Sequence, residues 1–311
     1  MRVLISEFMD APAVDALRQR FDVRYAPELV EQRAALLEAA ADADALIVRN
    51  RSQVNAELLA AAPRLVAVGR LGVGLDNIDL AGCEARGIKV IPATGANARA
   101  VAEYVIGTML SLLRGAYAST ADVAAGAWPR NALSQGLEAH GRTLGVVGFG
   151  GIGRLAAQLA RGLGMRIVGS DAALPSAHPA WQEAGAEPLA LEELLGQADV
   201  VTLHVPLTPE TRHLLDAARI ERMRPGAILI NTSRGGIVDE TALAAALRAG
   251  RLRGAALDVF EQEPLPAGGP LADAPNLILT PHIAGLTQEA NTRVSDMVAA
   301  GVTMALDARA R

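Results

Sequence analysis

Leu144-Gly145-Val146-Val147 leads directly into Gly148-Phe149-Gly150-Gly151-Ile152-Gly153, and a helical stretch at 154–160 follows. The hexapeptide fits G-x-G-x-x-G, which is weak evidence alone because the 30 glycines of the chain scatter such patterns by chance. Its position between an apolar strand and a helix is what a dinucleotide-binding turn requires. Gly148 permits the tight turn, Gly150 admits a pyrophosphate to backbone N–H groups, and Gly153 allows close helix–strand contact. These three glycines, together with Gly151 and Ile152, form the predicted phosphate-binding turn.

An acidic residue stands where the second strand of this region is predicted to end. Asp171 comes about eighteen residues after the last glycine of the turn. A carboxylate there accepts hydrogen bonds from the adenosine ribose hydroxyls and repels a 2′-phosphate. Ala172 and Ala173 follow it, so no adjacent Arg or Lys neutralises that phosphate. We therefore predict NAD, rather than NADP, as the cofactor.

The regions around this turn alternate short Val/Ile/Leu runs with Ala/Leu/Arg-rich stretches, a pattern typical of parallel α/β architecture. We predict two Rossmann-like or flavodoxin-like α/β domains with parallel sheets and an active-site cleft between them. Residues 97–286 form the predicted NAD-binding domain, and residues 1–96 with 287–311 form a discontinuous substrate domain. The predicted strands are 3–6, 45–48, 65–70, 89–91, 143–147, 166–169, 200–203, 227–230, 255–258 and 277–279. The main predicted helices are 11–20, 28–40, 55–61, 97–113 and 288–306.

Composition narrows the classes of function. The 311 residues are 51% hydrophobic, enough for a large buried core, and the net charge is -5. Neither half carries a basic surplus, which argues against nucleic acid as a partner. Cys83 is the only cysteine, so a disulfide within the chain and a cysteine zinc site are excluded, and we expect no metal. Apolar stretches are too short for a signal peptide or a membrane helix. The sequence predicts a cytoplasmic protein.

Three polar signatures follow the later predicted strands, where ligands bind in such sheets. They are Asn231-Thr232-Ser233-Arg234-Gly235-Gly236, Asp258-Val259-Phe260-Glu261-Gln262-Glu263-Pro264 and Thr280-Pro281-His282-Ile283-Ala284-Gly285. With the glycine turn, these ordered motifs closely resemble the D-isomer-specific 2-hydroxyacid dehydrogenase family, over about residues 45–290. The resemblance implies hydride transfer between C2 of a small 2-hydroxy acid and the nicotinamide of NAD.

The resemblance also implies the catalytic roles. Oxidation of an alcohol needs a base for the hydroxyl proton, and a histidine, with an unperturbed pKa of about 6.5, suits that task. His282 is that base in the resemblance, and Glu263 is the carboxylate on its other ring nitrogen. Arg234 would hold the substrate carboxylate in its planar fork. Val73, Gly74 and Asn97 are further expected substrate contacts. The remaining expected cofactor contacts are Val101, His204, Val205, Pro206, Thr211, Thr232, Ser233, Asp258 and Gly285, of which His204 is interpreted as mainly structural.

The substrate prediction goes beyond the family. Arg49 and Arg51 follow a predicted strand, and two-residue alternation would point them the same way. Phosphoglycerate dehydrogenases of the family place basic residues on this loop, so we predict a substrate with a second anion at C3, 3-phosphoglycerate or 3-sulfolactate. If both arginines are solvated or paired with acidic residues, that prediction loses its basis. A glyoxylate/hydroxypyruvate or D-lactate-type reductase and an NAD-responsive corepressor-like binding protein stay open as alternatives.

Two other classes of dehydrogenase fit the sequence less well. The sequence also predicts that the chain forms a homodimer. The formate dehydrogenase branch lacks a glutamate at the position of Glu263, and the order of the glycine turn, Arg, Glu and His does not support an L-specific lactate or malate dehydrogenase. The helix at 97–113 and Gly126-Ala127-Trp128-Pro129 resemble the dimerisation region of the family. An aromatic side chain such as Trp128 can anchor an interface, so we expect a homodimer.

Overall fold

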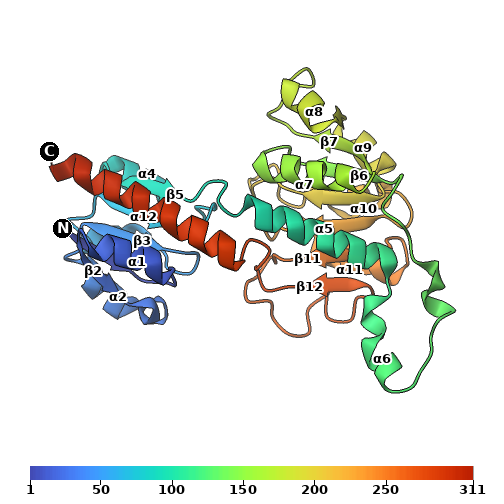
Figure 1. The fold of residues 1–311 in the computed structure, drawn as a ribbon, viewed down its shortest axis with the longest axis horizontal. Helices are drawn as coiled ribbons and strands as arrows, with labels where there is room; N and C mark the ends of the chain where they lie inside the picture. The colour runs from blue at the N-terminus through green and yellow to red at the C-terminus, as the bar shows by residue number, and fades with distance from the viewer. Residues whose placement is uncertain (311) are drawn as a thin grey trace. The chain divides into compact units, whose positions relative to one another are not determined.

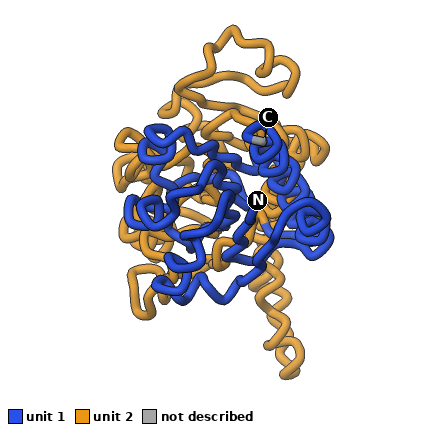
Figure 2. The backbone as a smooth tube through the Cα atoms, turned by 90° about the vertical axis from the view of Figure 1, so that its left-hand side faces the viewer, with its two compact units in different colours: residues 1–97, 286–311 blue, residues 98–285 orange. Residues whose placement is uncertain are grey.

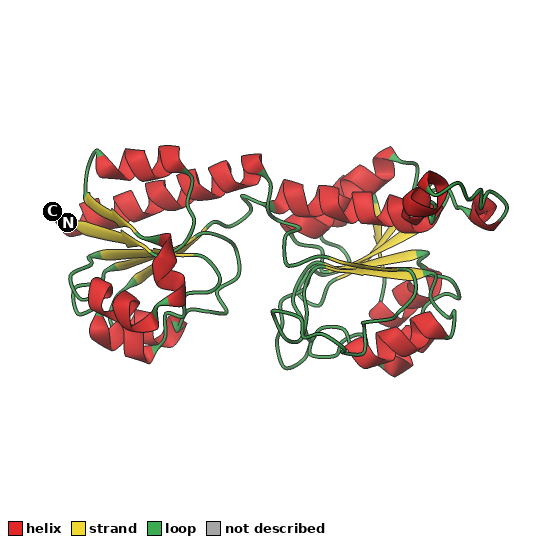
Figure 3. Ribbon diagram, turned by 90° about the horizontal axis from the view of Figure 1, so that it is seen from below, coloured by secondary structure: helices red, strands yellow, loops and turns green. Residues whose placement is uncertain are grey.

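The computed structural model describes residues 1–310, and its chain folds into two compact units (Figure 2). Unit 1 comprises Met1–Asn97 and Leu286–Arg311, and unit 2 comprises Ala98–Gly285. Each unit is a sheet covered on both faces by helices (Figure 3). This layering follows from the sequence, because the central parallel strands are apolar on both faces and need cover on each.

Unit 1 has five parallel strands in the order β2-β1-β3-β4-β5. One face is covered by α1 and α12, and the other by α2, α3 and α4 (Figure 1). The strands are β1 (Arg2–Ile5), β2 (Asp22–Tyr25), β3 (Ala45–Val48), β4 (Ala67–Arg70) and β5 (Lys89–Pro92). The helices are α1 (Ala11–Arg18), α2 (Arg33–Ala40), α3 (Ala56–Ala61), α4 (Leu80–Ala85) and α12 (Gln288–Ala310), with a short 3-10 helix, η1 (Pro27–Glu31).

Unit 2 has seven parallel strands in the order β12-β11-β10-β9-β6-β7-β8. Its strands are β6 (Thr143–Val147), β7 (Arg166–Ser170), β8 (Ala186–Pro188), β9 (Val200–Leu203), β10 (Ile228–Asn231), β11 (Gly254–Leu257) and β12 (Leu277–Leu279). The helices α5 (Ala98–Arg114), α7 (Gly151–Gly162) and α8 (Pro179–Ala184) cover one face. The other face is covered by α9 (Leu191–Gln197), α10 (Ala217–Arg222) and α11 (Glu240–Arg248). Between α5 and β6 lie η2 (Tyr117–Ser119), α6 (Thr120–Ala124) and η3 (Ala132–Gln135).

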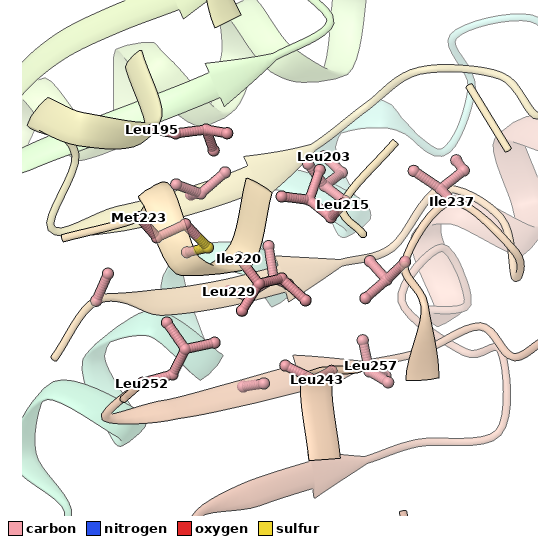
Figure 4. Close-up of a cluster of buried hydrophobic side chains, with 14 of the residues drawn as sticks. Leu195, Leu203, Leu215, Ile220, Met223, Leu229, Ile237, Leu243, Leu252 and Leu257 are labelled. Carbon is pink, nitrogen blue, oxygen red and sulfur yellow. The ribbon is translucent and has the colours of Figure 1, made fainter. Parts of the chain in front are cut away.

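The core of unit 2 shows why this sheet is rigid enough to carry a site. Leucine, isoleucine and valine side chains from β9, β10 and β11 interdigitate with those of α9, α10 and α11 (Figure 4). Leu203, Leu229 and Leu257 are almost completely buried there. Each buried side chain of this size contributes roughly 1.5–3 kcal/mol of transfer free energy. The strand ends that lead into the polar motifs are therefore fixed by packing.

The predicted α/β class with parallel sheets is confirmed, but the element list needs three corrections. β2 and β8 were not predicted, because both are short edge strands without a Val/Ile/Leu run. The single helix expected at 28–40 is interrupted, with η1 ending at Glu31 and α2 beginning at Arg33. Edge strands have one unpaired side and half-exposed residues, so the apolar signal that marks the central strands is missing from them.

The strand order also locates the places where ligands bind. In unit 2 the order reverses between β6 and β9, and in unit 1 between β1 and β3. Crevices at the carboxyl ends of strands on either side of such a reversal are the binding sites of open α/β sheets. Within residues 1–310, no helix is long and apolar enough to span a bilayer.

Candidate functional site

The glycine turn joins β6 to α7 in unit 2. The surroundings of its glycines differ from one position to the next. Gly148 has a φ of 91°, which side chains rarely tolerate, and a Cβ there would lie 2.5 Å from the His204 carbonyl oxygen. A Cβ on Gly153 would lie 2.2 Å from the Gly148 carbonyl oxygen. By contrast, a Cβ on Gly150 or Gly151 would meet no atom within 4 Å. The turn is therefore tight against the protein at its two ends and open in the middle, at the N-terminus of α7.

Asp171 links the glycine turn to the end of β7. The Phe149 N–H donates to Asp171 Oδ2 at 2.7 Å, and the Ala173 N–H donates to Oδ1 at 2.8 Å. The carboxylate thus orders both the turn and the residues after it. A carboxylate retains further acceptor capacity after two or three such bonds. The half-buried Asp171 is accordingly oriented with room for additional donors such as hydroxyl groups.

These residues fit a dinucleotide. The open middle of the turn exposes the first N–H groups of α7, whose helix dipole favours an anion. On the loop after β10, which is separated from β6 by β9, the buried Thr232 Oγ1 has no hydrogen-bond partner within the described part of the chain. An unsatisfied buried hydroxyl costs free energy unless a ligand supplies a partner. Gly150, Gly151, Asp171 and Thr232 are therefore suited to hold NAD.

The other residues expected to contact the cofactor are buried, half-buried or already hydrogen-bonded within the protein. His204 follows β9, its Nε2 lies 3.0 Å from Thr202 Oγ1, and burial lowers its pKa to about 4. The Thr211 hydroxyl already donates to the Pro206 carbonyl at 2.6 Å, and Val101 is buried in α5. Val205, Ser233 and Gly285 are half-buried at loops that follow β9, β10 and β12. A neutral His204 fits the mainly structural role predicted for it.

His282 and Glu263 form the central pair of unit 2. His282 Nδ1 lies 2.8 Å from Glu263 Oε2, and the φ of His282 is 57°, an uncommon backbone conformation for a residue with a side chain. The Phe260 N–H donates to Glu263 Oε1 at 3.1 Å. Burial raises the pKa of Glu263, but the hydrogen bond and charge of His282 outweigh it with help from Phe260 and Arg234, so the pKa lies below its ordinary value. Glu263 is consequently an ionised carboxylate fixed on one ring nitrogen of His282.

Arg234 is held close to this pair by backbone contacts. Asn231 closes the turn before it, because Nδ2 donates to the Arg234 carbonyl at 2.9 Å while Oδ1 accepts from the Ser233 N–H at 3.0 Å. A Cβ on Gly235 would lie only 1.7 Å from the Phe260 carbonyl oxygen, so the two loops approach backbone to backbone. The guanidinium is near enough to help lower the pKa of Glu263. A cation, a carboxylate and an imidazole are thus gathered at one sheet edge.

Asp258 organises the loop that carries His282. It is 1% exposed, its Oδ1 accepts from Thr280 Oγ1 at 2.6 Å and the Ile283 N–H at 2.8 Å, and its Oδ2 accepts from the Ala284 N–H at 2.8 Å. Tyr104 Oη lies 2.6 Å from Thr280 Oγ1 and extends this chain to α5. The nicotinamide contact expected of Asp258 stays a prediction. In this structure its carboxylate orders the loop that carries His282.

In unit 1 the two arginines do not project together. β3 ends at Val48, so strand alternation does not extend to them. Arg49 Nη2 donates to Asn291 Oδ1 at 2.8 Å, and its guanidinium lies 5.9 Å from the centre of the Phe8 ring. The Arg51 guanidinium instead forms a 2.5 Å ion pair with Glu31. The premise that both face one point was therefore wrong, although both remain on the loop at the carboxyl end of β3.

The other residues expected to bind substrate lie at the same edge of the unit 1 sheet. Val73 is exposed and Gly74 half-buried on the loop after β4. Asn97 follows β5, and its buried Oδ1 lacks a hydrogen-bond partner among residues 1–310. Over those residues, no group of three or more His, Cys, Asp or Glu side chains is arranged to hold a metal ion.

The sequence interpretation missed several polar residues near these sites. Glu7 and Asn77 are buried beside the loop at 49–52, and Tyr104 and Thr280 are bonded beneath His282. Only Glu7 could have been found from its position, because it comes two residues after the apolar strand β1, at the end of the strand where ligands bind in such sheets. Tyr104 lies inside the predicted helix at 97–113, which is mainly apolar, so its position did not mark it as a residue near a site.

Comparisons with known proteins agree with this geometry. The sequence profile described as "D-isomer specific 2-hydroxyacid dehydrogenase, NAD binding domain" matches residues 106–284. The chain is 54% identical to the (S)-sulfolactate dehydrogenase of Chromohalobacter salexigens over 99% of both chains. It is 40% identical to the D-3-phosphoglycerate dehydrogenase of Mycobacterium tuberculosis, covering 98% of this chain but 56% of that protein. The D-lactate dehydrogenase of Aquifex aeolicus, solved with NAD and lactic acid, superposes with a TM-score of 0.87 at 29% identity, covering 99% of this chain and 96% of that one.

Proposed function

Because the chain belongs to the D-isomer specific 2-hydroxyacid dehydrogenase family, whose members are NAD-dependent oxidoreductases, we propose that its substrate is a 2-hydroxy acid with a second anion at C3. The two candidates are 3-sulfolactate and 3-phosphoglycerate. The observation that carries the proposal is the presence of Arg49 and Arg51 on one loop at the carboxyl edge of the unit 1 sheet. A simple acid such as lactate offers those cations no partner.

His282, supported by Glu263, accepts the proton of the substrate hydroxyl. Glu263 holds Nδ1 of His282, which leaves Nε2 as the nitrogen that takes the C2 hydroxyl proton during oxidation. The ionised Glu263 stabilises the imidazolium that forms, as a carboxylate does in other histidine-based sites. Arg234 binds the substrate carboxylate through its planar fork. NAD, when bound, supplies the hydride acceptor.

Stereochemistry is consistent between the two candidates. In 3-sulfolactate the sulfur-bearing C3 outranks the carboxylate, whereas in 3-phosphoglycerate and lactate the carboxylate outranks C3. The (S) label of sulfolactate therefore describes the same spatial arrangement as the D configuration of the other acids. One arrangement of Arg234 and His282 serves both, and the C3 anion is what distinguishes these substrates from lactate or glycerate.

The charges of unit 1 support an anion at this loop. Burial lowers the pKa of Arg49 against the opposing effects of Glu7 and Asp10, and the side chain is oriented by the neutral Asn291 amide. The Arg51–Glu31 pair is exposed on both sides, and such pairs contribute only about 0–1 kcal/mol. The sulfonate or phosphate group of such a substrate can compete with Glu31 for Arg51. We place 3-sulfolactate first, since the 54% identical relative named for it matches over its full length.

The test is a substrate panel with purified protein and NAD or NADH, monitored by NADH absorbance. Sulfolactate and 3-phosphoglycerate should give kcat/KM at least tenfold above glycerate and D-lactate. Arg49→Ala should raise KM for the dianion much more than for glycerate. Best activity with glyoxylate or hydroxypyruvate would favour the reductase alternative. NADH binding without turnover of any acid would favour the corepressor-like alternative.

We also infer a homodimer. α6 extends away from the rest of unit 2 (Figure 1), and none of the residues of η2, α6 or η3 is buried. The segment at 115–138, which contains α6, carries large exposed side chains at Tyr117, Val123 and Trp128, the last 79% exposed. Aromatic residues exposed on an extended segment are typical anchors of an interface. A second copy of the chain is the proposed partner.

A further inference from the structure

Three loops of unit 1 meet at the carboxyl ends of β1, β3 and β4. The loop after β1 begins with Ser6 and Glu7, the loop after β3 covers residues 49–52, and the loop after β4 covers residues 71–77. The second of these carries the proposed C3-anion arginines, and the third carries Val73 and Gly74. The neighbouring positions of β1, β3 and β4 in the sheet bring the loops together.

Glu7 holds the backbone N–H groups of the loop after β3. It is 5% exposed, and its Oε1 accepts from the Arg49 N–H at 2.8 Å and the Ser52 N–H at 2.9 Å. Its Oε2 accepts from the Arg51 N–H at 3.3 Å. Hydrogen bonds to a charged acceptor are roughly twice as strong as neutral ones. One side chain therefore fixes the backbone of both arginines.

Asn77 holds the carbonyl groups of the same loop. It is 7% exposed, and its Nδ2 donates to the Ser52 carbonyl at 2.7 Å and the Arg49 carbonyl at 3.3 Å. Asn77 ends the loop that carries Val73 and Gly74, so this bond ties that loop to the arginine loop. A third buried link joins Ser6 Oγ to Ser52 Oγ at 3.1 Å.

We propose that Glu7 and Asn77 are positioning residues that set the spacing between the loop with Val73 and Gly74 and the loop with Arg49 and Arg51. In this proposal the loop with Val73 and Gly74 contacts the carboxylate end of the substrate and the loop with Arg49 and Arg51 contacts its C3 anion, so a fixed spacing favours acids that carry both anions. This inference rests on the proposed function. Neither side chain touches the substrate. Each acts through the backbone of the residues that do.

A purely structural role is the competing explanation, because removing a buried hydrogen-bonded carboxylate leaves N–H groups unpaired and destabilises the fold. Stability alone does not separate the explanations, but selectivity does. A structural defect lowers the activity toward every acid by a similar factor. A change of spacing lowers the activity toward dianionic acids more than toward glycerate.

Asp44 provides a matched control. It is also a buried carboxylate of unit 1, 6% exposed, and its Oδ2 accepts the Arg2 N–H at 2.7 Å. It immediately precedes β3, so it lies at the opposite end of that strand from residues 49–52. Asp44→Asn should cost stability as Glu7→Gln does, without changing the spacing of the anion-binding loops.

The experiment compares wild type, Glu7→Gln, Asn77→Ala and Asp44→Asn with sulfolactate, 3-phosphoglycerate and glycerate. The ratio of kcat/KM for the better dianion to that for glycerate should fall at least tenfold in Glu7→Gln and in Asn77→Ala, mainly through KM, and stay within threefold in Asp44→Asn. Glu7→Asp, which keeps the charge, should recover part of the ratio. Hydrogen exchange of the amides at 49, 51 and 52 should quicken in Glu7→Gln.

An unchanged ratio in the first two variants, or an equal fall in Asp44→Asn, overturns the positioning role. If Glu7→Gln does not fold, Asn77→Ala, which keeps the Glu7 carboxylate and its three N–H donors paired, carries the test. Failure of both to fold while Asp44→Asn folds assigns the pair a structural role and also overturns the proposal. A wild type with no preference for dianions refutes the proposed substrate class itself, and the amide exchange then shows separately whether Glu7 holds the loop.

Discussion

His282 Nδ1 lies 2.8 Å from Glu263 Oε2, although the two residues belong to different loops of unit 2. Burial raises the pKa of Glu263, but the hydrogen bond and charge of His282, with help from the Phe260 N–H and the Arg234 charge, keep it below its ordinary value. The imidazole is therefore held by an ionised partner and presents its other nitrogen. This relationship supports the proposed role of His282 as the base, because Glu263 occupies Nδ1 and leaves Nε2 for the substrate.

Removing the base should abolish the proton transfer and spare cofactor binding. His282→Ala should lower kcat by about a hundredfold or more, since general bases contribute 10²–10⁴. NADH affinity, measured by fluorescence titration, should change little because the glycine turn and Asp171 are untouched. The exposed His178 caps α8 elsewhere in unit 2, so His178→Ala serves as the control. Turnover of His282→Ala near that of wild type would refute the assignment.

Two substitutions of Arg234 should separate the effect of its positive charge from the effect of its planar shape. Arg234→Lys keeps the positive charge but loses the fork that pairs with a carboxylate. We expect KM for the acid to rise more than tenfold in Arg234→Lys, and still more in Arg234→Ala. Steady-state kinetics with glycerate, which has no C3 anion, isolates the effect on the C1 carboxylate. An unaltered KM in Arg234→Lys would mean that the carboxylate is bound elsewhere.

Asp171 should control both the cofactor preference and the order of the glycine turn. Asp171→Ala removes the repulsion of a 2′-phosphate and also the acceptor of the Phe149 N–H. NAD affinity should therefore weaken, and the ratio of kcat/KM for NAD to that for NADP should fall at least tenfold. Both cofactors are to be compared at saturating acid. A wild-type preference for NADPH would contradict this reading of Asp171.

The acid sensitivity of the fold should depend on His204. Burial lowers its pKa to about 4 in the folded state, whereas an unfolded histidine titrates near 6.5. The unfolded chain takes up the proton first, so the stabilisation is complete above pH 6.5 and is lost as pH falls from 6.5 toward 4. The loss amounts to at most about 3.5 kcal/mol, at about 1.4 kcal/mol per pKa unit.

Urea unfolding at pH 7.5 and pH 5 measures this effect. The difference in unfolding free energy between the two pH values should shrink in His204→Gln, whose amide can still bond Thr202 but does not titrate. Glu263, with its lowered pKa, also loses stabilisation on acidification, but only as pH falls below about 4.5. An identical pH dependence in wild type and His204→Gln would show that His204 is accessible to protons in the folded protein.

The proposed dimer has a simple physical readout. Light scattering at micromolar concentration should give about twice the 32.3 kDa mass of the chain. Trp128→Asp places a charge in the proposed interface and should shift the mass toward the monomer while the thermal unfolding of the separated chains stays cooperative. A wild-type mass of one chain would exclude the dimer.

Much of the fold and of the chemistry was determined by the sequence by itself. The glycine turn, the carboxylate at Asp171 and the motifs around Arg234, Glu263 and His282 depend on local conformation and on short stretches at strand ends. A turn that needs positive φ at Gly148, or a backbone approach that only Gly235 permits, leaves its mark in the residue types themselves. Central strands are equally readable, because burial on both faces demands an apolar run.

Only the tertiary structure decided which polar side chains share a partner. Glu7 and the loop at 49–52 are more than forty residues apart, and Tyr104 lies far along the chain from Thr280. It also decided that Arg51 pairs with Glu31 while Arg49 contacts Asn291. Such pairings depend on the order of strands in the sheet and on the path of each loop after its strand ends. The periodicity of the sequence predicts neither the strand order nor the loop paths. Alternation ends where a strand ends, and long-range hydrogen bonds leave no local sequence pattern.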